Sequence, residues 1–327
     1  MTARLTRAAA LAAVGVALAA CTSPAYPYPV NTSPPPRPRL LVPPSSKPAS
    51  YLGVYEPGVP ASYAQVEAFA KAVGRQPNLA LYFSGWGEQF KTSFARAARA
   101  HGAVPMIDMN PFGVSMRYIA AGRSDGYLRS FALAVRSYGY PVVISFAHEM
   151  NGNWYPWGWT RASPTEWIKA WRHVVTLFRR SGADNVAWLW AVNGVATGEG
   201  PIRYWWPGKS YVTWVGMDAY YTQPTQDFTN LFGPTIAAIR EITHKPLLIA
   251  ETAVGRLAGQ AAKIPNLFAG VRAYHLLGFV WFDKAQNNGL YHQNWRIDSV
   301  PAALAAFRRA ARHYPVTGAR RAGSRTG

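Results

Sequence analysis

Residues 142–159 read VVISFAHEMNGNWYPWGW and combine an apolar run with a loop rich in aromatic residues. The run Val142–Phe146 is short and partly β-branched, which is typical of a strand buried on both faces. His148 and Glu149 follow it closely, and an HExxH sequence on a helix would indicate a zinc protease. Gly152 occupies the position of the second histidine, however, and glycine offers no side chain to a metal. The His-Glu pair is therefore predicted to lie at the end of a strand rather than on a helix.

Apolar runs of similar length recur along the chain and alternate with amphipathic stretches. Strands that are apolar throughout are expected in a parallel sheet covered by helices on both faces. Eight alternations of strand and helix predict an α/β fold, a single (β/α)₈ TIM barrel over residues 51–315. The runs begin at Tyr51, Leu79, Val104, Val142, Val186, Tyr211, Pro246 and Gly278.

Local motifs support this architecture. Residues 163–166 read SPTE, which predicts a helix start with a capping box and proline at the first helical position. A doubly wound open sheet is the competing architecture, but it would be expected to carry a glycine-rich phosphate turn. Residues 207–210 resemble the end of a P-loop, yet Arg203 stands where the leading glycine should be. The pattern therefore favours the barrel.

Charge is strongly one-sided. The 327 residues include 34 Lys and Arg against 15 Asp and Glu, giving a net charge of +19. Basic residues are scattered except in the C-terminal tail, so they form no stripe of the kind that binds nucleic acid. We interpret the charge as a general attraction to an anionic envelope or cell-wall polymer, and expect no nucleic-acid partner.

The N-terminus predicts export. Arg4 and Arg7 precede the apolar run Ala8–Ala20, which has the length of a signal-peptide core. The sequence LAAC at 18–21 resembles the bacterial lipobox, which implies cleavage before Cys21 and lipid modification of its thiol; an ordinary secretory signal is the alternative. Cys21 is the single cysteine, so no intrachain disulfide can form. We expect an exported protein, lipid-anchored to the cell membrane and facing the extracellular side.

The chain is thus divided into four segments. Residues 1–20 are predicted to be a lipoprotein-type signal peptide. Residues 21–50 contain Cys21 and a linker rich in Pro, Ser and Thr, which favours extended, disordered chain. The barrel follows over 51–315, and 316–327 form a basic, flexible tail.

Several predicted strands end in a carboxylate, where a barrel places its chemistry. Two carboxylates facing one another across a cleft are the requirement for glycoside hydrolysis, and tryptophan or tyrosine rings stack on sugars. The aromatic residues around 154–159 suit such a groove. The strand-end carboxylates are Asp108, Glu149, Asp218, Glu251 and Asp283.

Two motifs, in this order, carry a specific resemblance. HEMNGNWYPWGW from His148 and KPLLIAETAVG from Lys245 resemble glycoside hydrolase family 26, which contains β-mannanases with some β-glucanases and xylanases. Weaker matches are AGRSDGYLRSFA from Ala121 and GMDAYY from Gly216. The resemblance covers most of 51–313. It implies a TIM barrel with catalytic glutamates on strands four and seven and a retaining double displacement.

Carried onto this chain, the resemblance implies that Glu149 is the acid/base and Glu251 the nucleophile, with Tyr220 hydrogen-bonded to the nucleophile. Desolvation by aromatic neighbours should disfavour the ionised form of Glu149, while hydrogen-bond donors should keep Glu251 ionised. Retention requires the two carboxyl groups to be about 5–5.5 Å apart, whereas a separation of about 6.5–9.5 Å would contradict it.

Other positions are expected to bind substrate. His148 would orient the substrate or Glu149, and Trp281 resembles the tryptophan that floors the central sugar site. Trp154, Asn193 and Asp108 are further candidates, each with an alternative role in loop packing or support of the site. No cofactor or metal site is predicted, and a tethered barrel of this kind is expected to be monomeric.

One departure bears on the substrate. Many mannanases of this family carry Arg-Pro-Phe before the His-Glu pair, whereas residues 145–147 here are Ser-Phe-Ala. Loss of an arginine changes the charges around the acid/base. The leading hypothesis is an endo-β-1,4-mannanase. A mixed-linkage β-1,3-1,4-glucanase and a non-catalytic glycan-binding lipoprotein are the alternatives.

Overall fold

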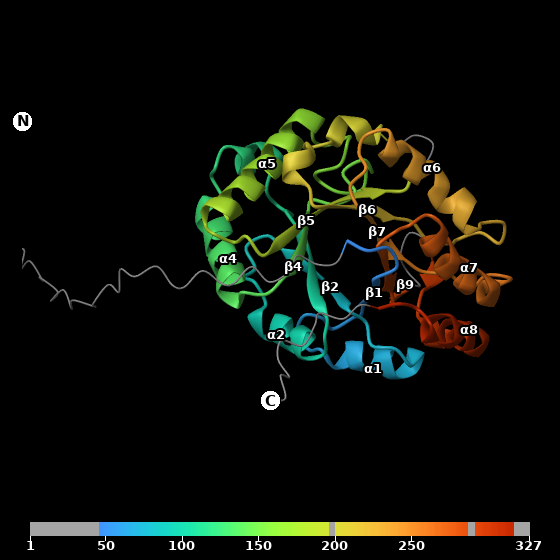
Figure 1. The fold of residues 1–327 in the computed structure, drawn as a ribbon. Coiled ribbons are helices and arrows are strands. Elements are labelled where there is room, and N and C mark those ends of the chain that lie inside the picture. Colours follow the sequence, from blue (N-terminus) through green and yellow to red (C-terminus); the bar gives the residue numbers. More distant parts are fainter. Residues whose placement is uncertain (1–45, 196–199, 287–291, 317–327) are drawn as a thin grey trace, which may run out of the picture. The chain divides into compact units, whose positions relative to one another are not determined.

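The computed structural model describes residues 46–195, 200–286 and 292–316. In this part of the chain eight parallel strands close into a barrel in sequence order, surrounded by helices (Figure 1). The TIM barrel is confirmed, and the open doubly wound sheet is excluded. The strands are β1 (Tyr51–Tyr55), β2 (Leu79–Gly85), β3 (Val104–Asn110), β4 (Val142–Phe146), β5 (Val186–Asn193), β6 (Trp214–Asp218), β7 (Leu247–Thr252) and β8 (Gly278–Phe282).

The helices cover the outer face of the barrel. The predicted capping box at the start of α5 is confirmed, because Ser163 Oγ accepts from the Glu166 amide at 3.2 Å. None of the helices in the described ranges is long and apolar enough to span a bilayer. The helices are α1 (Ala64–Val73), α2 (Thr92–Ala100), α3 (Met116–Ala120), α4 (Asp125–Tyr138), α5 (Pro164–Arg180), α6 (Phe228–Arg240), α7 (Gln260–Ala273) and α8 (Pro301–Arg312).

The loops at the C-terminal ends of the strands contain short elements. The 3₁₀ turns Ile202–Trp205 and Lys209–Tyr211 lie between β5 and β6, and Ile297–Ser299 precedes α8. After β8, β9 (Ala285–Gln286) pairs antiparallel with β10 (Gln293–Asn294). The P-loop-like residues 207–210 thus lie in the connection between β5 and β6. They are followed by β6 and not by the α-helix that a P-loop would precede.

Two separate apolar clusters follow from the alternation of side chains along each strand. One lies between the strands and the helices, and the other fills the barrel interior. Because side chains alternate with a period of two, the positions beyond the interior cluster lead to the barrel mouth. Met106 thereby places Asp108 at the mouth, and Trp214 places Asp218 there. The interior cluster includes Tyr51, Leu79, Leu81, Val104, Met106, Val143, Leu189, Trp214, Leu248, Ala250 and Val280.

A bulge in β7 changes this alternation. Ile249 pairs with Phe279 and Thr252 pairs with Trp281, so β7 has one extra residue over this stretch. On the other side, the register places Glu251 opposite Asp218. One extra residue reverses which face the following side chains occupy. Without it, Glu251 would follow the interior residue Ala250 on the outer face of the barrel.

Several predictions concern segments outside this part of the chain. The signal peptide over 1–20, Cys21, most of the linker and nearly all of the basic tail lie outside the described residues.

Candidate active site

Four carboxyl groups gather at the mouth of the barrel. Asp108 lies on the inward face of β3, Glu149 follows β4, Asp218 ends β6 and Glu251 lies near the end of β7. Their side chains are buried, with exposures between 1% and 9%. The negative charges of Glu149 and Glu251 both act to raise the pKa of Asp108 and of Asp218, which indicates that the four groups share one electrostatic environment. The fold therefore concentrates acids from four separate strands.

A tight turn presents Glu149. Ala147 and Glu149 both adopt positive φ angles, 49° and 51°, a conformation that non-glycine residues seldom adopt. Backbone hydrogen bonds to the neighbouring strands hold the turn, since the Glu149 amide donates to the Ala191 carbonyl at 3.0 Å and the Ala147 amide to Met109 at 3.1 Å. Positive φ at such residues costs about 1–3 kcal/mol each and persists only where surrounding structure imposes it.

Two tryptophans complete this support. Trp157 Nε1 donates to the His148 carbonyl at 2.7 Å, and Trp167 Nε1 of α5 donates to the Ala147 carbonyl at 3.1 Å. Both indoles are buried. Of the two roles considered for the aromatic loop, packing therefore describes Trp157. A role for Trp167 was not predicted, because the sequence does not reveal that the indole N–H of a helical residue is aimed at a neighbouring loop.

Trp154 has a different environment. Its Nε1 donates to Glu149 Oε2 at 3.0 Å, while its side chain is 43% exposed. The neighbouring Tyr155 stacks on Trp157 with ring centroids 4.5 Å apart. Tyr155 Oη also lies 3.1 Å from His148 Nε2. The loop thus brings Trp154 to the acid/base candidate and leaves part of its ring open to solvent.

His148 lies in the same cluster. Its side chain is 1% exposed, and burial lowers its pKa to about 3. The imidazole is therefore neutral at physiological pH, and it can donate or accept a hydrogen bond without carrying charge.

Tyr220 contacts Glu251 as expected. Its hydroxyl donates to Glu251 Oε2 at 2.5 Å, which lowers the pKa of that carboxyl. Burial acts in the opposite direction and is the larger effect, so the pKa of Glu251 is raised to about 7. The expectation that donors keep Glu251 ionised is therefore wrong at acidic pH, because one hydroxyl does not offset removal of the carboxylate from water.

Asp108 and Asp218 are more strongly affected. Burial, followed by repulsion from Glu251 and Glu149, raises the pKa of each well above its ordinary value. Each side chain therefore holds its proton to higher pH than an ordinary aspartate does, and a protonated carboxyl group can donate as well as accept hydrogen bonds.

Asn193 ends β5 beside the loop after β4. Its amide donates to Asn151 Oδ1 at 2.9 Å, and Asn151 Nδ2 donates to the Asn193 carbonyl at 2.9 Å. The buried Asn151 side chain thus continues the pairing between the loop and β5. These contacts show a supporting role for the backbone of residue 193, whose side chain is partly buried.

Trp281 does not occupy the position predicted for it. Its indole is fully buried and packs against Phe307 of α8, with ring centroids 5.4 Å apart. Alternation along β8 places Val280 in the interior cluster and Trp281 on the outer face. The prediction that Trp281 floors a sugar site is therefore wrong. Phe282, the next residue, has the inward register and lies against Tyr55, with centroids 4.7 Å apart.

Asp283 also has a separate role. Its Oδ1 accepts from the Ile297 amide at 2.6 Å and from Trp281 Nε1 at 3.1 Å. Glu56 directly follows β1. Burial and the nearby Asp283 raise the pKa of Glu56 to about 10. Asp283 therefore anchors the loop after β8 to the barrel.

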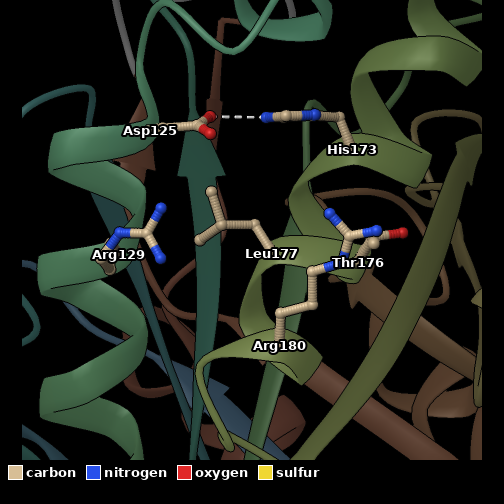
Figure 2. A pocket seen from close by; sticks show the side chains of 6 residues that line it. All are labelled: Asp125, Arg129, His173, Thr176, Leu177 and Arg180. Atoms are coloured by element: carbon tan, nitrogen blue, oxygen red, sulfur yellow. Dashed lines mark hydrogen bonds and ion pairs between the residues drawn. The ribbon is translucent and has the colours of Figure 1, made fainter.

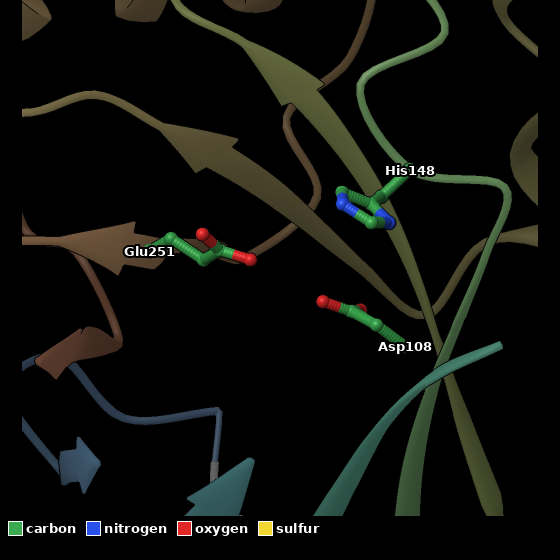
Figure 3. Close-up of side chains that lie close together, drawn as sticks. All are labelled: Asp108, His148 and Glu251. Carbon is green, nitrogen blue, oxygen red and sulfur yellow. The ribbon is translucent and has the colours of Figure 1, made fainter. Parts of the chain in front are cut away.

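Three residues remote in sequence come together in a way that no local motif predicted. One donor atom from each of Asp108, His148 and Glu251 lies within 4.8 Å of the other two, and all three side chains are buried (Figure 3). The sequence contains no contiguous cluster of metal ligands; closure of the barrel alone creates this one.

Burial of Glu251 predicts a cost in stability that depends on pH. Because its pKa is raised from 4.5 to about 7, the penalty is absent below pH 4.5, grows as pH rises, and reaches roughly 3 kcal/mol above pH 7. Glu251→Gln should therefore raise the unfolding temperature at pH 8 and lose this advantage near pH 4.5, measured by thermal denaturation.

Glu166→Gln is the matched control with the opposite sign. Its hydrogen bond with Arg117 and its capping interaction lower the pKa of Glu166, so the substitution should slightly destabilise the protein at pH 8. Equal stability of Glu251→Gln and the unmodified protein at both pH values would contradict the burial argument.

Several known proteins are similar to this chain in sequence. Endoglucanase H of Acetivibrio thermocellus is 31% identical over 271 residues, which are 77% of this chain and 29% of that protein. A mannan endo-1,4-beta-mannosidase of Bacillus subtilis strain 168 is 29% identical over 182 residues, or 49% of this chain and 46% of the relative. The chain thus spans less than a third of the first relative's length and about half of the second's.

Solved structures show the same fold. The Bacillus subtilis mannanase BCman superposes with a TM-score of 0.62 at 16% identity, over 84% of this chain and 88% of that one. A Cellulomonas fimi endo-beta-1,4-mannanase gives 0.60 at 20% identity, over 76% of this chain and 66% of that one. The model of glycosyl hydrolase family 26 matches residues 132–307, more than half of the chain and the segment that carries both Glu149 and Glu251. The chain is therefore a member of glycosyl hydrolase family 26.

Proposed function

We propose that this protein is a retaining glycoside hydrolase that cleaves β-linked polysaccharide, and that its substrate is β-1,4-mannan cut within the chain. The main support is the pair of buried glutamates from β4 and β7 with different surroundings. Glu251 accepts a hydrogen bond from Tyr220, and Glu149 accepts one from the half-exposed Trp154. Such a division of environments is what assigns two carboxyl groups to separate acid and nucleophile roles.

In the first step, a Glu251 carboxylate oxygen attacks the anomeric carbon as the glycosidic C–O bond breaks. Glu149 gives its proton to the departing oxygen, so the leaving sugar departs as an alcohol and a glycosyl ester remains on Glu251. In the second step, Glu149 takes a proton from water, and the resulting hydroxide attacks the anomeric carbon and releases Glu251. The two displacements return both glutamates to their starting states and retain the anomeric configuration.

The remaining groups at the mouth support substrate binding. Asp108 and Asp218 lie near Glu251 and Glu149, and their carboxyl groups are hydrogen-bonding partners for sugar hydroxyls. His148 contributes a neutral imidazole. The exposed face of Trp154 provides a surface on which a sugar ring can stack beside Glu149.

A mixed-linkage β-glucan is the second candidate substrate. It is favoured by Ser145, which lies opposite Asp108 in the β3–β4 register where many mannanases of the family carry arginine. Endoglucanase H, a relative over most of this chain, points in the same direction by its name. A site without that arginine presents less positive charge to the neighbouring carboxyl groups.

We also propose that the protein is exported and anchored by lipid at Cys21, which places it at the outer face of the cell membrane and near polysaccharide. The lipobox-like sequence at 18–21 supports this. Cys21→Ser should move the protein from the membrane fraction to the soluble fraction and abolish labelling by a fatty acid. Unchanged membrane recovery of the variant would contradict lipid anchoring.

Hydrolysis is tested by incubating the purified protein with β-1,4-mannan and, separately, with barley β-glucan while new reducing ends are measured. We expect the unmodified protein to release new reducing ends from mannan. Glu251→Gln should lower the rate of this release at least about a thousandfold, because the nucleophile is removed without loss of volume. Release only from glucan would replace mannan by the second candidate. No release from either by a folded protein would contradict hydrolysis of these polymers and favour a glycan-binding role.

The pH profile tests the role of Tyr220. Glu251 must be ionised to attack, so kcat/KM should rise with pH through about 7 on its acidic limb. Tyr220→Phe removes a hydrogen bond that stabilises the ionised form, so the acidic limb should move to higher pH. Tyr314→Phe is the control, because its buried hydroxyl has no hydrogen-bond partner and lies outside the site. An acidic limb that Tyr220→Phe leaves in place would contradict this role.

A further inference from the structure

We propose that Asp108, His148 and Glu251 form a binding site for Zn²⁺ at the mouth of the barrel, and that the metal inhibits hydrolysis by occupying the nucleophile. Binding of the ion requires only the geometry of the three side chains. Inhibition rests on the proposed function, because it needs Glu251 to be the attacking group.

The three donors converge from separate strands. Their donor atoms lie within 4.8 Å of one another, and Figure 3 shows the side chains of Asp108 and His148 directed toward Glu251. Zinc bonds to nitrogen and oxygen are about 2.0–2.2 Å long, so two ligands of one ion are at most about 4.4 Å apart. Movements of a few tenths of an ångström would therefore bring all three atoms into coordination.

Each of these residues has a buried polar atom without a hydrogen-bond partner. In the described part of the chain these atoms are Asp108 Oδ1, His148 Nδ1 and Glu251 Oε1. An unsatisfied buried polar atom costs about 1–3 kcal/mol, so each of the three residues has an atom that a bound partner would stabilise. A cation satisfies all three together, since each atom offers a lone pair once the carboxyl groups are ionised.

Two of the three side chains also have a tyrosine as partner. His148 Nε2 lies 3.1 Å from Tyr155 Oη, and Glu251 Oε2 accepts from Tyr220 Oη at 2.5 Å. Metal ligands commonly have such outer partners, which fix the orientation of the ring and of the carboxylate. The two tyrosines therefore orient the imidazole and the carboxylate as outer partners of a metal would.

Charge and ligand type favour zinc. Among the residues that the structure describes, neither Asp108 nor Glu251 forms an ion pair with a basic side chain. A divalent cation would neutralise both carboxylates and so offset the burial that raises their pKa values. One imidazole nitrogen with two carboxylate oxygens suits Zn²⁺, whereas Ca²⁺ takes six to eight oxygen ligands. Three protein ligands leave one position for water.

Bound zinc would hold Glu251 Oε1 and fill the space in which a sugar ring must approach. The ion and the polysaccharide would then compete for the same site.

Binding is tested by isothermal titration of Zn²⁺ into the full chain after treatment with a chelator. We expect one tight site in the unmodified protein, weakened at least tenfold in Asp108→Asn and in His148→Gln. The matched control is His173→Gln, which breaks another His-carboxylate pair between α5 and α4, where His173 Nε2 lies 2.6 Å from Asp125 (Figure 2). This control should bind zinc as the unmodified protein does.

Circular dichroism identifies any variant that does not fold. If one variant fails to fold, the zinc affinity of the other variant decides the test. Cobalt substitution adds a second readout, because a nitrogen- and oxygen-ligated tetrahedral Co²⁺ has visible absorption bands that Asp108→Asn and His148→Gln should lose. Equal zinc affinity in the unmodified protein and both folded variants, or loss of the site in His173→Gln, would overturn the proposed site.

The inhibitory effect is measured separately on polysaccharide hydrolysis. Zinc at concentrations above its Kd should raise KM for the polymer, and a chelator should restore the original value. Full hydrolysis by zinc-saturated protein would overturn the inhibitory role. A protein that binds zinc at these residues but cleaves no polysaccharide would contradict the proposed function and leave the metal site supported.

Discussion

The extra residue in β7 is the constraint on which the site depends. A closed barrel assigns alternate side chains to its interior and to its helix-covered surface, and this assignment admits no local exception without a bulge. Leu248 and Ala250 follow the interior register, so the bulge is what gives Glu251 the same register as Asp218. The acid from β7 meets those of β3 and β6 only because of this irregularity.

Several carboxyl groups gathered at one point destabilise the folded protein, and only a few hydrogen-bond donors among the described residues offset this cost. Tyr220 lowers the pKa of Glu251, but burial prevails. The turn that carries Glu149 stores backbone strain as well, held by Trp157 and Trp167. Unsatisfied polar groups and backbone strain at the barrel mouth lower the stability of the protein. Such a local loss of stability is expected where residues are selected to bind a ligand rather than for folding alone. The same groups account for both proposals, because sugar hydroxyls and a cation are alternative partners for one set of oxygens and nitrogens.

Much of the fold could be predicted from sequence because strand and helix periods are local properties. Apolar runs such as Val142–Phe146 and the capping box at Ser163 depend on nearby residues alone. The candidate acids could be found for the same reason, since each ends an apolar run. Trp281 shows where such reasoning fails. A run that is apolar throughout does not reveal which of its faces points inward, and in β8 the inward register belongs to Val280 and Phe282.

Bulges and long-range contacts were equally invisible in the sequence. The convergence of Asp108, His148 and Glu251 needs three strands and one extra residue to be placed together. The most direct test of the role given to Glu251 is mass spectrometry after incubation with a fluorinated β-glycoside whose glycosyl ester hydrolyses slowly. Covalent attachment of the sugar to Glu251 is predicted. Attachment to Asp108 or Asp218 instead, or release of product with inverted anomeric configuration, would contradict the assignment of Glu251 as nucleophile.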